Sequence, residues 1–81
     1  MRILLSYPTD VGIFDIGQDE NKKYHPIFNE DSLGVYASIQ EAVDNLITNN
    51  VSKVIDPETN ENIDTSKLGI PQNYTEWDMG Y

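Results

Sequence analysis

Cysteine is absent from this chain of 81 residues, which excludes a disulfide framework and a thiolate metal site. The single histidine, His25, lacks neighbours at the spacings of zinc ligands, so we expect no metal and interpret His25 as a half-exposed strand residue. A chain of this length should fold as a single domain, residues 1–81, with a small core. A small core gains stability by self-association, so the sequence is also compatible with a homo-oligomer.

Long apolar runs are also missing. The N-terminal run Ile3-Leu4-Leu5 is too short for the apolar region of a signal peptide or for a membrane span. The sequence therefore predicts a soluble, cytoplasmic protein.

Basic residues are scarce. Five stand against fourteen acidic residues, which gives a net charge of −9. A surface of this sign repels phosphate, so direct binding to nucleic acid or to an anionic membrane is not expected. The charge either maintains solubility or attracts a basic protein as a partner.

Motifs for catalysis and for cofactor binding are absent as well. The sequence contains no Gly-x-Ser-x-Gly elbow and no glycine-rich phosphate loop, and His25 is the only histidine that could act as a base for a nucleophilic serine. Residues 56–62 alternate oxygen-bearing side chains as calcium loops do, but Glu61 stands where an EF-hand needs glycine and Lys67 where it needs glutamate. We expect no enzyme, no catalytic residues and no cofactor.

The clearest pattern that is present predicts one helix, from a cap at Ser38 to about Thr48. Ser38 and Glu41 have the spacing of a capping box, in which each side chain accepts the backbone N–H of the other residue. Apolar residues then recur at helical spacing, which indicates one buried face: Ile39, Ala42, Val43, Leu46 and Ile47.

Strand patterns surround this helix. Residues 3–7, 11–16, 23–28 and 33–36 predict an antiparallel meander, with a turn at 8–10 and a polar hairpin loop at 17–22. Within it, Phe14 and Ile16 share one face and Val11 and Ile13 the other, while Pro26 favours an edge or a bulge. Residues 51–55 and 62–64 predict a C-terminal hairpin. The fold class is α+β: a small antiparallel meander sheet with one amphipathic helix packed on one face, then a C-terminal hairpin and tail.

The tail from residue 65 onward carries apolar side chains in a polar segment. Gly69 and Pro71 prevent a long helix there. We expect the tail to lie ordered along the domain with Trp77 at least half buried. The alternative is that its aromatic residues anchor another chain. The candidate partner-binding residues are Tyr74, Glu76, Trp77 and Asp78.

Three sequence pieces resemble a group of small bacterial proteins whose activity is not established. They are residues 4–14, residues 24–46 and residues 63–77, the last with Leu-Gly-Ile-Pro followed by Glu-Trp. The resemblance covers most of the chain and implies a curved hairpin sheet with one helix. It carries no functional residues over to this protein.

The sequence thus favours a non-enzymatic protein-interaction or regulatory module. The alternative is an acidic decoy that mimics nucleic acid and inhibits a basic nucleic-acid-binding protein. Regularly spaced carboxylates along one face would favour the decoy, and an exposed apolar patch would favour the interaction module.

Overall fold

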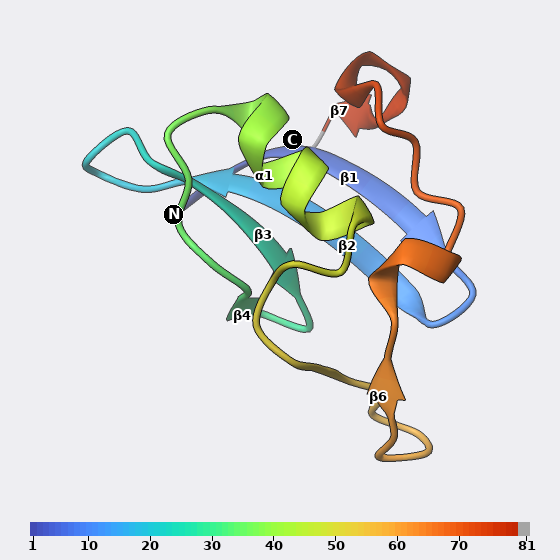
Figure 1. The fold of residues 1–81 in the computed structure, drawn as a ribbon. Helices are drawn as coiled ribbons and strands as arrows, with labels where there is room; N and C mark the ends of the chain where they lie inside the picture. The colour runs from blue at the N-terminus through green and yellow to red at the C-terminus, as the bar shows by residue number, and fades with distance from the viewer. Residues whose placement is uncertain (80–81) are drawn as a thin grey trace.

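The computed structural model describes residues 1–79, and its main element is an antiparallel sheet (Figure 1). The strands lie in the order β4-β3-β2-β1-β7, so the first four form the meander that the sequence predicts. Their bounds are β1 Arg2–Thr9, β2 Gly12–Gln18, β3 Tyr24–Phe28, β4 Asp31–Ser32 and β7 Asp78–Met79.

The first hairpin turns later than the sequence predicts. β1 continues through Pro8, and the turn lies at residues 10–11. Thr9 fixes this turn, because its hydroxyl donates to the carbonyl of Gly12 at 2.7 Å and accepts the N–H of Val11 at 3.3 Å. Pro8 is tolerated because β7 pairs with β1 only at residues 5–6, which leaves Pro8 at an open edge.

Pro26 pairs with Ile16 of β2 on one side, and on the other side it lies just past the end of β4, which pairs only with Ile27 and Phe28. On that outer side its carbonyl accepts the N–H of Leu33 at 2.8 Å. In an antiparallel strand, the backbone N–H and C=O of one residue point to the same side. The side on which Pro26 lacks an N–H is therefore the side that faces Leu33, and no hydrogen bond to β2 is lost. The predicted strand at 33–36 is replaced by β4 and by a single bridge between Tyr24 and Tyr36.

The helix α1, Ile39–Ile47, forms where its cap and its apolar stripe predict it. The Ser38 hydroxyl accepts the N–H of Glu41 at 3.1 Å. The return bond differs from the expected one, because the Glu41 carboxylate accepts the N–H of Ala37, at 3.0 Å, instead of that of Ser38. Both bonds still satisfy donors at the start of the helix.

The core lies between α1 and one face of the sheet. Ala42, Val43 and Leu46 of the helix are fully buried, as are Phe14 and Ile16 of β2, and the rings of Phe14 and Phe28 stack at 4.5 Å. The alternation predicted for β2 is confirmed for Ile13, which is 57% exposed on the other face. Val11 is an exception to that prediction: it lies in the turn and packs against the core.

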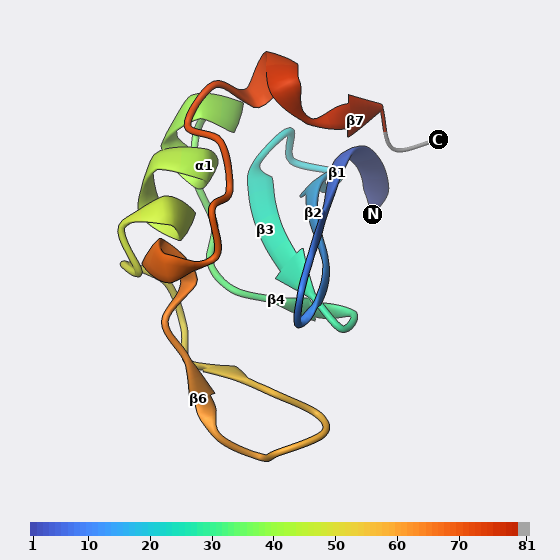
Figure 2. The same cartoon turned by 90° about the vertical axis from the view of Figure 1, so that its right-hand side faces the viewer.

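The rest of the chain forms a projecting hairpin and a tail (Figures 1 and 2). The predicted hairpin consists of β5, Val54–Ile55, and β6, Asn62–Ile63. Two short 3-10 helices follow, η1 at Thr65–Lys67 and η2 at Tyr74–Glu76. Among residues 1–79, α1 is the longest helix, and no helix is long and apolar enough to cross a bilayer.

Candidate functional site

The tail is held along α1 by contacts at both ends of the helix. η1 contacts the C-terminal end of α1, and the backbone carbonyl of Gln72 accepts an amide hydrogen of Gln40 near its N-terminal end, at 3.1 Å. Trp77 then packs against Tyr7 of β1 with ring centroids 5.8 Å apart, and its indole N–H donates to the carbonyl of Pro71 at 3.1 Å. Trp77 is only 5% exposed, so the predicted burial of this residue is confirmed.

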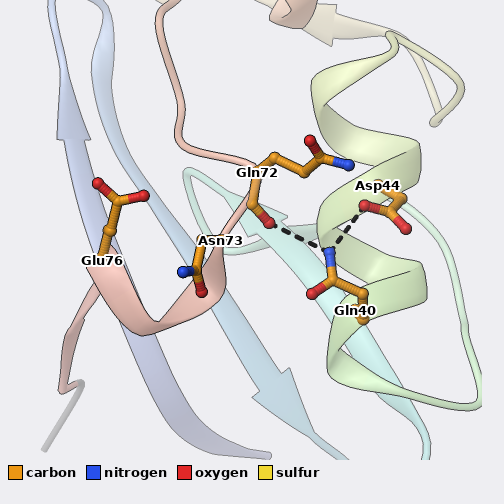
Figure 3. A pocket seen from close by; sticks show the side chains of 5 residues that line it. All are labelled: Gln40, Asp44, Gln72, Asn73 and Glu76. Carbon is orange, nitrogen blue, oxygen red and sulfur yellow. Dashed lines mark hydrogen bonds between the residues drawn. The ribbon is translucent and has the colours of Figure 1, made fainter.

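This arrangement leaves a polar groove between α1 and the tail (Figure 3). The groove has a volume of about 470 Å³, and it opens to solvent. Three amide and two carboxylate side chains line it: Gln40, Asp44, Gln72, Asn73 and Glu76. We call it the tail groove.

Hydrogen bonds decide which atoms the tail groove can offer to a ligand. The Gln40 amide nitrogen donates both to Asp44, at 2.8 Å, and to the Gln72 carbonyl, so its own oxygen remains as an acceptor. The Asn73 side-chain oxygen accepts the backbone N–H and the hydroxyl of Thr75, at 3.0 and 2.7 Å, which leaves the Asn73 amide as a donor. With Glu76, the groove presents mainly acceptors.

A cationic group that donates several hydrogen bonds fits this set of atoms. Charge-assisted hydrogen bonds to carboxylates are about twice as strong as neutral ones, and the guanidinium of arginine presents five donors in a planar fork. The lining contains no lysine or arginine that would occupy the place of such a group. It also contains no hydroxyl, thiol or imidazole side chain.

The predicted partner-binding residues lie on the tail, in different environments. Glu76 lines the tail groove, Tyr74 on η2 is 36% exposed, and Asp78 is exposed on β7. Trp77 is buried among them and attaches this segment to the sheet. A partner at this surface would therefore contact Tyr74, Glu76 and Asp78, with Trp77 beneath them.

The sequence prediction missed the other half of the groove. The sequence analysis assigns no binding role to Gln40 and Asp44 of the helix or to Gln72 and Asn73 of the tail. The i, i+4 spacing of Gln40 and Asp44 was the available signal, since it lets the amide bond the carboxylate. That the tail crosses this face of the helix has no signature in the local sequence.

A second polar cluster joins Asp19, His25 and Ser32. The His25 nitrogens lie 2.7 Å from an Asp19 carboxylate oxygen and 2.8 Å from the Ser32 hydroxyl. His25 is only 7% exposed, so the half-exposed position predicted for it is wrong. Both neighbours give the ring hydrogen-bond partners, and this permits its burial.

The cluster has the composition of a catalytic triad, with a carboxylate, an imidazole and a hydroxyl in a row. The Ser32 hydroxyl also lies 3.1 Å from the carbonyl of Gly34, so its single hydrogen has two acceptors within reach, this carbonyl and Nδ1 of His25. In either arrangement the cluster connects the loop between β2 and β3 to β4.

Metal ligands do not gather in the part of the chain that the structure covers. Residues 1–79 contain no group of three or more His, Cys, Asp or Glu side chains placed to hold an ion. The alternating oxygen side chains of residues 56–62 lie in and around the exposed β5–β6 turn, where Asp56 instead accepts the N–H of Glu58 at 2.9 Å.

Comparisons with known proteins do not link this geometry to an established activity. No protein-family model, no curated protein and no solved structure matches the chain.

Proposed function

We propose that this protein is a non-enzymatic, cytoplasmic interaction module that binds a basic protein through the tail groove. The observation that supports the proposal is the lining of that groove: two carboxylates and three amides around about 470 Å³, with no cationic side chain among them. Tyr74, exposed on the adjacent η2, adds an aromatic surface of the kind that is enriched in protein interfaces.

The charge of the whole chain supports the same partner. A net charge of −9 accelerates the encounter with a basic protein through long-range attraction. The groove then gives this attraction a specific place, because carboxylates in a concave site focus the field.

The acidic decoy is the alternative form of this proposal. It also requires a basic partner, but its carboxylates should follow the dense spacing of phosphates, about one charge per 1.7 Å of duplex axis. The tail groove instead mixes two carboxylates with three amides. This composition favours a partner recognised through individual hydrogen-bonding side chains.

The proposal is tested by titrating the labelled protein with a hexa-arginine peptide and recording two-dimensional amide NMR spectra. The side-chain NH2 signals of Gln40, Gln72 and Asn73 should shift in a saturable way. The double variant Asp44→Asn, Glu76→Gln should weaken binding about tenfold or more, the effect of losing about 1.4 kcal/mol.

A second double variant, Glu20→Gln with Glu58→Gln, is the matched control, since it removes the same charge from exposed loops. If both double variants weaken binding equally, the attraction comes from net charge and the groove is not the site. The decoy would be supported instead if the protein still displaced duplex DNA from a basic nucleic-acid-binding protein while the peptide was bound to it.

A further inference from the structure

Within residues 1–79, no helix covers the face of the sheet that points away from α1 (Figure 2). The alternation of β2 places Ile13, Asp15 and Gly17 on this outer face, opposite the inward Phe14 and Ile16. The cross-strand partners of these residues include Ile3 on β1 and Ile27 on β3. The outer face therefore combines apolar side chains with a carboxylate.

Two hollows meet at two carboxylates on this face. One, of about 440 Å³, extends past Ile13 to the end of the sheet, where Phe28 and Pro57 also line it, and the other, of about 340 Å³, is lined by Met1, Ile3 and Ile27. Asp15 and Glu30 line both hollows, and neither lining includes a lysine or arginine. The face thus presents an apolar hollow, an acidic centre and a second apolar hollow.

Gly17 lies beneath the side chains that line the second hollow. A Cβ atom at this position would lie 2.7 Å from the Met1 sulfur and 2.9 Å from Cδ1 of Ile27, both far closer than a normal contact. The absence of a side chain at Gly17 therefore lets Met1 and Ile27 approach the strand closely.

The acidic centre carries charge that the chain does not itself neutralise. Asp15 accepts the Ser6 hydroxyl at 2.5 Å, a bond to a neutral group. Glu30 is exposed in the β3–β4 turn, where it and Asn29 adopt positive φ angles of 71° and 52°. Within residues 1–79, neither carboxylate forms an ion pair with a lysine or arginine.

From this pattern we infer that the outer face binds an amphipathic basic segment of another protein. The segment carries a lysine or arginine between two apolar side chains. Its cation lies between Asp15 and Glu30, and its apolar side chains occupy the two hollows. A second copy of this chain fits poorly, because a symmetric contact would place the acidic centres against each other. The inference is independent of the tail groove, which lies on the α1 side.

The test uses a synthetic peptide of alternating leucine and lysine, with one matched peptide in which glutamate replaces lysine and another in which serine replaces leucine. NMR titration should show saturable shifts at β1, β2 and β3 with the first peptide and at least about tenfold weaker binding of the other two. Binding should weaken about fivefold or more in Ile13→Ser and in Glu30→Gln.

Val35→Ser and Glu20→Gln are the matched controls, because they change an exposed β-branched residue and an exposed loop carboxylate elsewhere. Their affinity should equal that of the wild type. Shifts confined to Gln40, Gln72 and Asn73 would overturn the inference and leave the tail groove intact. Equal binding of all three peptides would also overturn it, as would dilution-dependent shifts on the outer face without peptide, which would assign this face to self-association.

Discussion

At the scale of single residues, Thr65 shows how the tail is fixed. It is 1% exposed, its hydroxyl donates to the carbonyl of Leu46 at the end of α1, and its N–H donates to the side chain of Asn49 at 3.2 Å. One buried side chain thus joins η1 to the helix. A threonine in a polar segment gives no sign of this role, because the bond spans 19 positions in the sequence.

Replacing this threonine by valine should destabilise the protein. Thr65→Val keeps the shape but removes a buried hydrogen bond, so we expect a loss of about 1–2 kcal/mol in the free energy of unfolding. Urea denaturation followed by circular dichroism measures it. The control Thr59→Val, in the exposed β5–β6 turn, should change stability by less than about 0.5 kcal/mol. Equal effects would show that the Thr65 bond contributes nothing specific.

Asp19, the carboxylate beside His25, makes the stability of the fold depend on pH. The hydrogen bond from His25, and after it the backbone N–H of Lys23, lowers the pKa of Asp19 below its usual value of 3.8. A folded-state pKa below the unfolded one means that ionised Asp19 stabilises the fold above pH 3.8. This contribution is lost as the pH falls from there through the folded pKa.

Asp19→Asn should therefore be less stable than the wild type at pH 7, with the difference shrinking below pH 3.8. The substitution retains a side-chain oxygen for the loop N–H groups of Asn21 and Lys23, which bond the other oxygen of Asp19. Thermal melts of both proteins from neutral to strongly acidic pH measure the difference. A gap that stays constant across this range would show that the carboxylate charge is not involved.

At the scale of secondary-structure elements, local signals were reliable. The Ser38 cap, the apolar stripe of α1 and the alternation at Phe14 and Ile16 each depend on neighbours a few residues away, and each is confirmed. Two features differ from the prediction. The first turn depends on a local bond that the strand pattern does not reveal, because the Thr9 hydroxyl donates to the carbonyl of Gly12 three residues further on. The N–H of Leu33 bonds the carbonyl of Pro26 across the β3–β4 turn, and no strand begins at Leu33.

The helix cap offers a test of one such local signal. Ser38→Ala removes the acceptor for the Glu41 N–H, so we expect a loss of about 1 kcal/mol in the free energy of unfolding. Chemical denaturation measures it, with Ser52→Ala in an exposed loop as the control. If the two variants are equally stable, the Glu41 bond to Ala37 is sufficient to begin the helix.

The candidate site was predictable only in part, because it joins two elements. Composition identified the acidic aromatic tail with Tyr74 and Glu76. The other wall depends on long-range packing, since the side chain of Gln40 bonds the backbone of Gln72, which lies 32 positions further along the sequence. No pattern in either segment alone encodes that contact.

The packed tail itself is testable through the single tryptophan of the chain. Trp77 is buried against Tyr7, so its emission should be blue-shifted and protected from acrylamide in the folded protein. In urea the emission should shift to the red and become fully quenchable. Because no other tryptophan contributes, a solvent-like emission that does not change on unfolding would show that the tail is not attached as described.

At the scale of the whole molecule, the fold has two layers and leaves much of its surface for contact. α1 and the tail cover one face of the sheet, and the tail groove lies between them. The other face has no helix over it within residues 1–79, and Asp15 and Glu30 line both of its hollows. Both surfaces are acidic, so the two proposals share a partner chemistry while differing in the residues that test them.

The excess negative charge should also make stability depend on salt. The molecule measures 33 × 23 × 22 Å and carries a net charge of −9, so at low ionic strength its carboxylates repel across their full separation. Raising sodium chloride from about 0.01 M to about 0.1 M shortens the Debye length from about 30 Å to about 10 Å. The free energy of unfolding should therefore increase with salt.

The double variant Glu20→Gln with Glu58→Gln, which carries two fewer charges, should show a smaller increase in the free energy of unfolding over the same range. Urea titrations at each salt concentration measure both changes. A stability that falls with salt would instead mean that attraction between opposite charges outweighs the repulsion among the carboxylates.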